Sequence, residues 1–265
     1  MDALETFKAG QREAWSHFAP LQVQTMEPAA QLVKWAQIQS GQRVLDVACG
    51  TGVVAVTAAR RGADVTGLDL TPTLLEFAHD NARVAGVAVA WHEGDVEALP
   101  FDAASFDVVV SQYGHMFAPR PDVAIAEMLR VLKPGGTIAF STWPPELLMG
   151  RMFALTGSYM PAPPPGVAPP VLWGDPHVIR ERLGDRVRDL RFNRATMRVP
   201  SLGPRNTREM FEKSSGPVIK LVQALSGTDP AKLETLRSEM EALLAEYFDE
   251  NVIHQGYLIT RAIKG

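Results

Sequence analysis

The strongest constraint on the fold is an alternation, from Gly41 to Trp143, of short β-branched runs with longer segments of helical period. Parallel strands need helical crossovers of this length, so the alternation predicts a doubly wound, Rossmann-like α/β fold with helices on both faces of its sheet. Five strands are expected, and they span Arg43 to Ala48, Asp64 to Leu70, Val87 to His92, Phe106 to Gln112 and Thr137 to Trp143. Residues 41–143 therefore form the predicted core.

Segments outside this core have a different character. Residues 1–40 read as an N-terminal helical flap of two helices parted near Pro20 to Pro28. Residues 144–251 contain the proline-rich run from Met160 to Pro170, which predicts an extended stretch that opens a helical lid. The lid should also supply a sixth strand, Arg186 to Val199, and residues 252–265 the closing strand of the core sheet.

Composition narrows the classes of function. The 265 residues are 46% hydrophobic and 21% charged, which is ordinary for a globular protein. A net charge of −4 without a Lys/Arg-rich run argues against nucleic acid as the partner. The chain shows no apolar stretch of the ~18 residues that a membrane span needs and no secretory-type N-terminus, so a cytoplasmic location is expected. The oligomeric state stays open.

The segment from Val44 to Gly52, VLDVACGTG, stands where the first strand meets the first helix. Glycines at such a junction let the backbone pass close beneath a ligand, near the exposed N–H groups of the helix start. Asp69 ends the second strand about twenty residues further on, where a carboxylate can accept hydrogen bonds from both ribose hydroxyls of an adenosine. Both features predict one nucleotide-type ligand.

This spacing leaves two cofactors open. Gly50-Thr-Gly52-Val-Val-Ala55 also satisfies the dinucleotide pattern GxGxxA, so a nicotinamide-dependent oxidoreductase competes. Asp95 and Val96 follow the third strand, where an acid can bond an adenine amino group and an apolar neighbour can cover the ring. A dinucleotide fold does not require an acid at that point. A non-catalytic protein that binds an adenosine cofactor is the third alternative.

Taken together, the motifs VLDVACGTG, TGLDLTP, GDVEALPF, FDVVVSQYGHMFA and MLRVLKPGGTIAFSTW closely resemble the class I S-adenosylmethionine-dependent methyltransferases, in particular the ubiquinone/menaquinone-type (type 11) domain. The resemblance covers about Arg43 to Trp143 without a gap. It implies a seven-stranded sheet in the order 3-2-1-4-5-7-6 with the last strand antiparallel. It also implies S-adenosyl-L-methionine as cofactor and S-adenosyl-L-homocysteine as product.

The resemblance assigns cofactor contacts residue by residue. The methionine part of the cofactor would lie at Asp46 and the backbone of the loop that follows it, and the ribose at Asp69. Leu70 would cover the adenine face, and Asp95 with Val96 would contact the adenine edge. The transferred methyl would lie near the end of the fourth strand. In chain order these cofactor residues are Asp46, Ala48, Cys49, Gly50, Gly52, Asp69, Leu70, Asp95, Val96, Ser111 and Gln112. Ala48 stands where the family usually has glycine, and it adds only one methyl group.

Methyl transfer from a sulfonium is an in-line displacement whose leaving group is already activated, so aligning donor and acceptor in a dry site is the main task. A base would help a hydroxyl or acidic-carbon acceptor, and His115 just beyond the fourth strand is the tentative candidate. The alternative is that His115 only lines or caps the pocket and takes no part in proton transfer. Trp15 on the flap could cover the cofactor or pack between flap helices.

The motifs at the ends of the sheet strands are all assigned to cofactor contacts, so the residues that select the acceptor should lie in the lid. Its cluster of Met149, Met152, Phe153, Leu155, Tyr159 and Met160 either walls an apolar pocket or packs the lid onto the sheet. If it walls a pocket, a small hydrophobic or aromatic acceptor is favoured. The histidines show no paired ligand spacing, so no metal is expected. Cys49 is interpreted as a small loop residue rather than a nucleophile.

Overall fold

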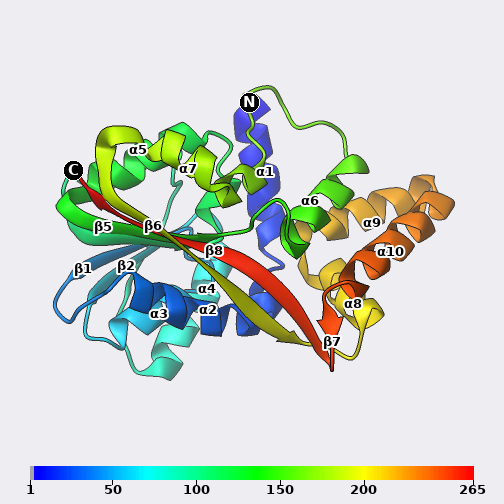
Figure 1. The fold of residues 1–265 in the computed structure, drawn as a ribbon, viewed down its shortest axis with the longest axis horizontal. Coiled ribbons are helices and arrows are strands. Elements are labelled where there is room, and N and C mark those ends of the chain that lie inside the picture. The colour runs from blue at the N-terminus through cyan, green and yellow to red at the C-terminus, as the bar shows by residue number, and fades with distance from the viewer. Residues whose placement is uncertain (1–2) are drawn as a thin grey trace.

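The computed structural model describes residues 3–265 and has one sheet in the order β3-β2-β1-β4-β5-β8-β6 (Figure 1). The parallel strands are β1 (Arg43–Val47), β2 (Asp64–Asp69), β3 (Ala90–Glu93), β4 (Phe106–Gln112) and β5 (Leu132–Thr142). The long strand β8 (Val252–Lys264) runs antiparallel between β5 and β6 (Val187–Pro200). The predicted order is confirmed; the closing strand is the eighth because the two-residue β7 (Phe248–Asp249) precedes it.

Helices cover both faces of the sheet, with α5 and α7 above it and α2, α3 and α4 below it in Figure 1. These helices span Pro121–Val131 (α5), Pro176–Leu183 (α7), Gln22–Trp35 (α2), Val53–Ala59 (α3) and Pro72–Ala85 (α4). Because helices bury both faces, the central strands are hydrophobic almost throughout rather than alternating. Val109 and Val110 of β4 are adjacent in sequence and both fully buried.

The lid consists of four helices beyond one end of the sheet, to the right in Figure 1. They are α6 (Leu148–Ser158), α8 (Pro204–Ser214), α9 (Gly216–Thr228) and α10 (Pro230–Ala245). The side chain of Asp229 caps α10 by accepting a hydrogen bond from Lys232 N at 3.0 Å. The strands β6 and β8 extend from the core sheet toward these helices, so the lid and the sheet share a continuous hydrogen-bonded ribbon.

The first helix of the flap is α1 (Ala3–Trp15), and the short 3₁₀ helix η1 (Ala19–Leu21) joins it to α2, the second helix of the flap. The helix α1 runs between the sheet and the lid helices (Figure 1). Three further 3₁₀ turns are η2 (His115–Phe117), η3 (Pro170–Gly174) and η4 (Gly184–Arg186). The break between α1 and α2 falls at residues 16–21, at the Pro20 end of the predicted interval, while Pro28 lies inside α2. Among residues 3–265, no helix combines the length and apolar character that crossing a membrane would take.

Candidate functional site

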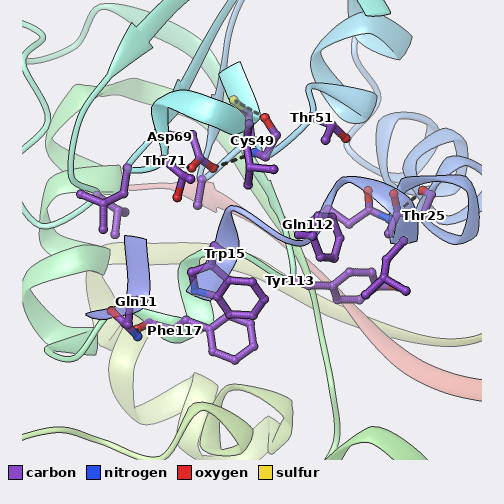
Figure 2. Close-up of a pocket in the computed structure, with 18 of the residues that line it drawn as sticks. Gln11, Trp15, Thr25, Cys49, Thr51, Asp69, Thr71, Gln112, Tyr113 and Phe117 are labelled. Carbon is purple, nitrogen blue, oxygen red and sulfur yellow. Dashed lines mark hydrogen bonds between the residues drawn. The ribbon is translucent and has the colours of Figure 1, made fainter. Parts of the chain in front are cut away.

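One pocket opens at the carboxyl ends of β1, β2 and β4 and is bordered by the flap, the start of α2 and the lid (Figure 2). This is the edge where ligands bind in open parallel sheets. Most of the predicted cofactor residues line it, and they are Trp15, Asp46, Ala48, Cys49, Gly50, Asp69, Leu70, Asp95, Val96 and Gln112. Gly52, Ser111 and His115 do not line it.

The loop after β1 bends through left-handed backbone at Ala48, Gly50 and Gly52, whose φ angles are 51°, 55° and 75°. At Gly50 a Cβ would meet no atom within 4 Å, so this stretch of backbone faces open space in the pocket. At Gly52 a Cβ would lie 2.4 Å from the Trp91 side chain. Gly52 is therefore explained by helix and strand packing, whereas Gly50 leaves room for a ligand.

Asp46 places an unsatisfied carboxylate oxygen at the start of this loop. Its Oδ2 accepts a hydrogen bond from Ala55 N at 3.0 Å, while its Oδ1 is buried and has no partner in the described chain. Burial raises the pKa of Asp46 to about 8. A buried carboxylate with a free oxygen is a fit for a cationic group such as the ammonium of a methionine moiety.

Asp69 is held rigidly at the end of β2. Its Oδ2 accepts from Gly50 N at 2.7 Å and its Oδ1 from Thr71 N at 2.8 Å, which fixes the plane of the carboxylate (Figure 2). Each oxygen keeps a second lone pair for a ligand hydroxyl. Burial raises the pKa of this carboxyl above its usual value. The arrangement fits the two adjacent hydroxyls of a ribose.

Asp95 is tied to the flap by an ion pair that the sequence did not suggest. Lys8 of α1 donates from Nζ to Asp95 Oδ2 at 2.5 Å and lies 2.8 Å from Glu97 Oε2. Arg120 also pairs with Glu97 at 2.7 Å, and the side chains of Lys8 and Glu97 are almost fully buried. Lys8 therefore latches the flap over the adenine end of the pocket. The sequence around Lys8 does not predict this contact, because it depends on where α1 packs in the folded protein.

Removing this latch should loosen the flap. In Lys8→Met, Asp95 and Glu97 lose a buried partner, and breaking a buried pair costs about 3–5 kcal/mol. We expect S-adenosylhomocysteine to dissociate at least about 10-fold faster, as measured by stopped-flow tryptophan fluorescence. Arg12→Met is the matched control, because its pair with Glu93 is about half-exposed on the same helix. Equal rates in the two variants would contradict the latch.

His115 does not face the pocket, which corrects its expected placement. Its ring is fully buried, 4.7 Å from the Phe140 ring and 4.8 Å from the Trp173 ring, and neither ring nitrogen has a partner in the described chain. Burial lowers the pKa of His115 to about 3. The chain turns after β4 at Tyr113, with φ 61°, and His115 and Met116 beyond this turn are both fully buried. The geometry gives no support to a base at His115.

Ser111 is likewise removed from the ligand. Its hydroxyl donates to Val47 O at 2.6 Å and accepts from His115 N at 3.2 Å, so it braces the junction of β1 and β4. Gln112, the next residue, does line the pocket and donates to Thr25 O at 3.1 Å. Alternate side chains of a strand point to opposite faces, so only one of this pair can reach the ligand.

The buried His115 gives a pH-dependent stability test. Its pKa is about 3 in the fold and ~6.5 when unfolded. The unfolded state therefore gains a proton as pH falls below 6.5, and stability is lost. At pH 4.5 this loss is about 2–3 kcal/mol, at ~1.4 kcal/mol per pKa unit.

In urea titrations, His115→Leu should therefore be more stable relative to wild type at pH 4.5 than at pH 7.5. The variant should also keep methyl transfer. The exposed His17→Leu serves as control. A difference in unfolding free energy that does not change with pH, or transfer lost while cofactor binding holds, would contradict the structural role.

The far end of the pocket is apolar. Aromatic and sulfur-containing side chains from the flap, η2, β5, the lid and β6 surround it, and they include Phe18, Phe117, Trp143, Met149, Phe153, Met197 and Phe211. The charged residues that line the pocket in the described chain, Lys8, Asp46, Asp69 and Asp95, all belong to the cofactor end. Trp15 lies 4.6 Å from the Phe117 ring, between the two ends (Figure 2).

The predicted lid cluster divides into two sets. Met149 and Phe153, one turn apart on α6, line the pocket. Met152 is buried in the core, and Leu155, Tyr159 and Met160 pack against the core instead. The lid meets the flap closely, because a Cβ on Gly216 of α9 would come 2.0 Å from Ala14 O of α1. Flap and lid thus pack against each other beside the pocket.

Comparison with known proteins agrees with this geometry. Residues 45–140 match the family model described as a methyltransferase domain. An uncharacterized protein of Mycobacterium tuberculosis is 37% identical over 257 residues, covering 96% of this chain and 93% of that protein. The demethylmenaquinone methyltransferase of Deinococcus radiodurans is 36% identical over 124 residues, covering 45% of this chain and 52% of that enzyme.

Solved structures share the fold. The YcgJ protein of Bacillus subtilis superposes with a TM-score of 0.59 at 18% identity, covering 90% of this chain and 98% of that one. Phosphoethanolamine N-methyltransferase 2 of Haemonchus contortus, in complex with S-adenosyl-L-methionine, gives 0.56 at 20% identity and covers 90% and 52%. With the sheet order, the motif match and the full-length relatives in agreement, the chain belongs to the class I methyltransferases of the type 11 domain family.

Proposed function

We propose that the protein transfers a methyl group from S-adenosyl-L-methionine to a small, uncharged hydrophobic or aromatic molecule. The observation that supports this most directly is the division of one enclosed pocket into a charged end at Asp46, Asp69 and Asp95 and an apolar end without charged side chains. A charged, nucleoside-bearing donor suits the first end and an apolar acceptor suits the second.

The chain's own residues would act mainly by binding and alignment. Asp46 would hold the donor's ammonium, Asp69 its ribose hydroxyls and Val96 one face of its adenine. The bound sulfonium supplies an activated methyl group. Gln112, at the end of β4, and Trp15, from the flap, lie between the two ends and would set the line of approach while the flap and lid exclude water.

The domain roles follow from the same division. Residues 41–143 would bind the donor, residues 1–40 would cover it, residues 144–251 would select the acceptor, and residues 252–265 would complete the sheet beneath both. The match to a methyltransferase domain disfavours the nicotinamide and non-catalytic alternatives.

Calorimetric titration with S-adenosylhomocysteine and with NAD separates the cofactors, and binding of the former alone is expected. Incubation of the protein with methyl-labelled donor and fractionated metabolite extract should then transfer label to an organic-soluble, neutral fraction. NAD binding without S-adenosylhomocysteine binding would overturn the donor. Label confined to charged, water-soluble products would overturn the acceptor class.

A further inference from the structure

Two polar side chains in the apolar end of the pocket lack hydrogen-bond partners. Gln255 of β8 is only 2% exposed, and its Nε2 has no partner in the described chain. Tyr113, which follows β4, is 7% exposed, and its hydroxyl is also without a hydrogen bond there, although the Gln112 side chain lies beside it. Both residues line the pocket.

These two residues belong to one wall. The Tyr113 ring stacks on Trp143 at 4.0 Å and meets the Tyr257 ring edge-on at 5.8 Å. Tyr257 lies two residues from Gln255 on the same buried face of β8, a separation of about 7 Å along a strand. Figure 2 shows Tyr113 beside Gln112 and Thr25, at the side of the pocket away from Asp69.

The remaining amides of this region are already engaged. Gln24 Nε2 donates to Met210 Sδ at 3.1 Å, and Gln112 Nε2 donates to Thr25 O. A buried donor that is left unpaired destabilises the protein, and a ligand that supplies an acceptor removes this cost. Tyr113 also holds a left-handed backbone angle, which is uncommon for a bulky residue and concentrates at functional sites.

We propose that Gln255 and Tyr113 determine acceptor specificity by donating hydrogen bonds to a carbonyl-type oxygen on a planar, uncharged apolar acceptor. This inference rests on the proposed function and names the polar feature of its substrate. Gln255 Nε2 can only donate, so its partner must accept. Burial raises the pKa of Tyr113 well above its usual value, so its hydroxyl stays protonated and can also donate.

A matched pair of probes tests this. 2-Acetonaphthone carries a carbonyl oxygen, and 2-isopropenylnaphthalene replaces that oxygen by a methylene group of nearly the same shape. Each is titrated calorimetrically into the full-length protein saturated with S-adenosylhomocysteine. We expect the ketone to bind wild type about 10-fold more tightly than the hydrocarbon, because only the ketone offers an acceptor to the otherwise unsatisfied donor.

Gln255→Leu should abolish the preference for the ketone, because leucine has no hydrogen-bond donor. Tyr113→Phe, which keeps the stacked ring, should reduce the preference. Gln24→Leu is the matched control for loss of a pocket amide and should leave the preference in place, because its donor is engaged in wild type. Melting temperatures and S-adenosylhomocysteine affinity should stay close to wild type in each variant.

Retention of the preference in Gln255→Leu, equal binding of both probes to wild type, or no binding of either would overturn this inference. Failure of the proposed function looks different. In that case wild type would not bind S-adenosylhomocysteine at all, whatever happens at Gln255.

Discussion

Asp69→Ala is expected to lower the affinity for S-adenosylhomocysteine by about 100-fold or more. The carboxylate of Asp69 would accept two hydrogen bonds from the ribose, and hydrogen bonds to charged groups contribute about 1.5–3 kcal/mol each. The change also frees Gly50 N and Thr71 N, which Asp69 now holds, so the loop beneath the ligand loses its support. Isothermal titration calorimetry measures the effect directly.

Asp64→Ala is the control for this experiment. Asp64 begins the same strand at its opposite, exposed end, so its loss should not change cofactor affinity. Thermal melts of both variants without ligand show whether the fold is kept. An Asp69→Ala protein that melts normally and binds S-adenosylhomocysteine like wild type would remove Asp69 from the ribose site.

Asp46→Asn should weaken cofactor binding and, at alkaline pH, stabilise the free protein. The folded pKa of Asp46 is about 8 against 3.8 in the unfolded chain, so the folded state holds a proton that the unfolded state has lost. Stability therefore falls as pH rises from about 4 to about 8. Asparagine cannot ionise, so the stability of the variant relative to wild type should rise by about 3–5 kcal/mol between pH 5 and pH 8.5.

Cofactor affinity should also depend on the ionisation of Asp46, but it should rise with pH where the stability of the free protein falls. A cationic ammonium beside Asp46 favours the carboxylate, so its pKa falls and a proton is released as the ligand binds. Between pH 6 and 7.5 the affinity for S-adenosylhomocysteine should rise by up to about 10-fold per pH unit in wild type and stay nearly flat in Asp46→Asn. Calorimetry in phosphate and in Tris reports the released proton. Equal heats in the two buffers would show that Asp46 does not meet the ammonium.

The sequence was a good guide to the sheet because each strand carries its own signal. The strand β4 has its predicted bounds, Phe106 to Gln112, and the order of the strands is as expected. Hydrophobic runs bounded by glycine and proline are local features, and short right-handed crossovers leave few ways to arrange them. Asp46, Asp69 and Gly50 could be placed in the pocket for the same reason, since they end strands or follow them directly.

The directions of individual side chains and the contacts between distant residues could not be predicted from the sequence, because neither depends on neighbouring residues alone. Ser111 and His115 flank the pocket residue Gln112 in the sequence, yet both are fully buried in the core. Ser111 lies on the opposite face of β4 from Gln112, and His115 follows the turn at Tyr113. Lys8 contacts Asp95 across 87 positions, and no pattern near either residue indicates the pair.

The sequence by itself determined the sheet, the cofactor loop and the carboxylates at its edge, because periodicity and turn chemistry act over a few residues. Only the tertiary structure decided that Lys8 latches the flap, that His115 is a core residue and that Gln255 lines the pocket. Each of these depends on how flap, lid and the last strand pack together. Burial and the pairing of polar groups are set by that packing rather than by neighbours in the chain.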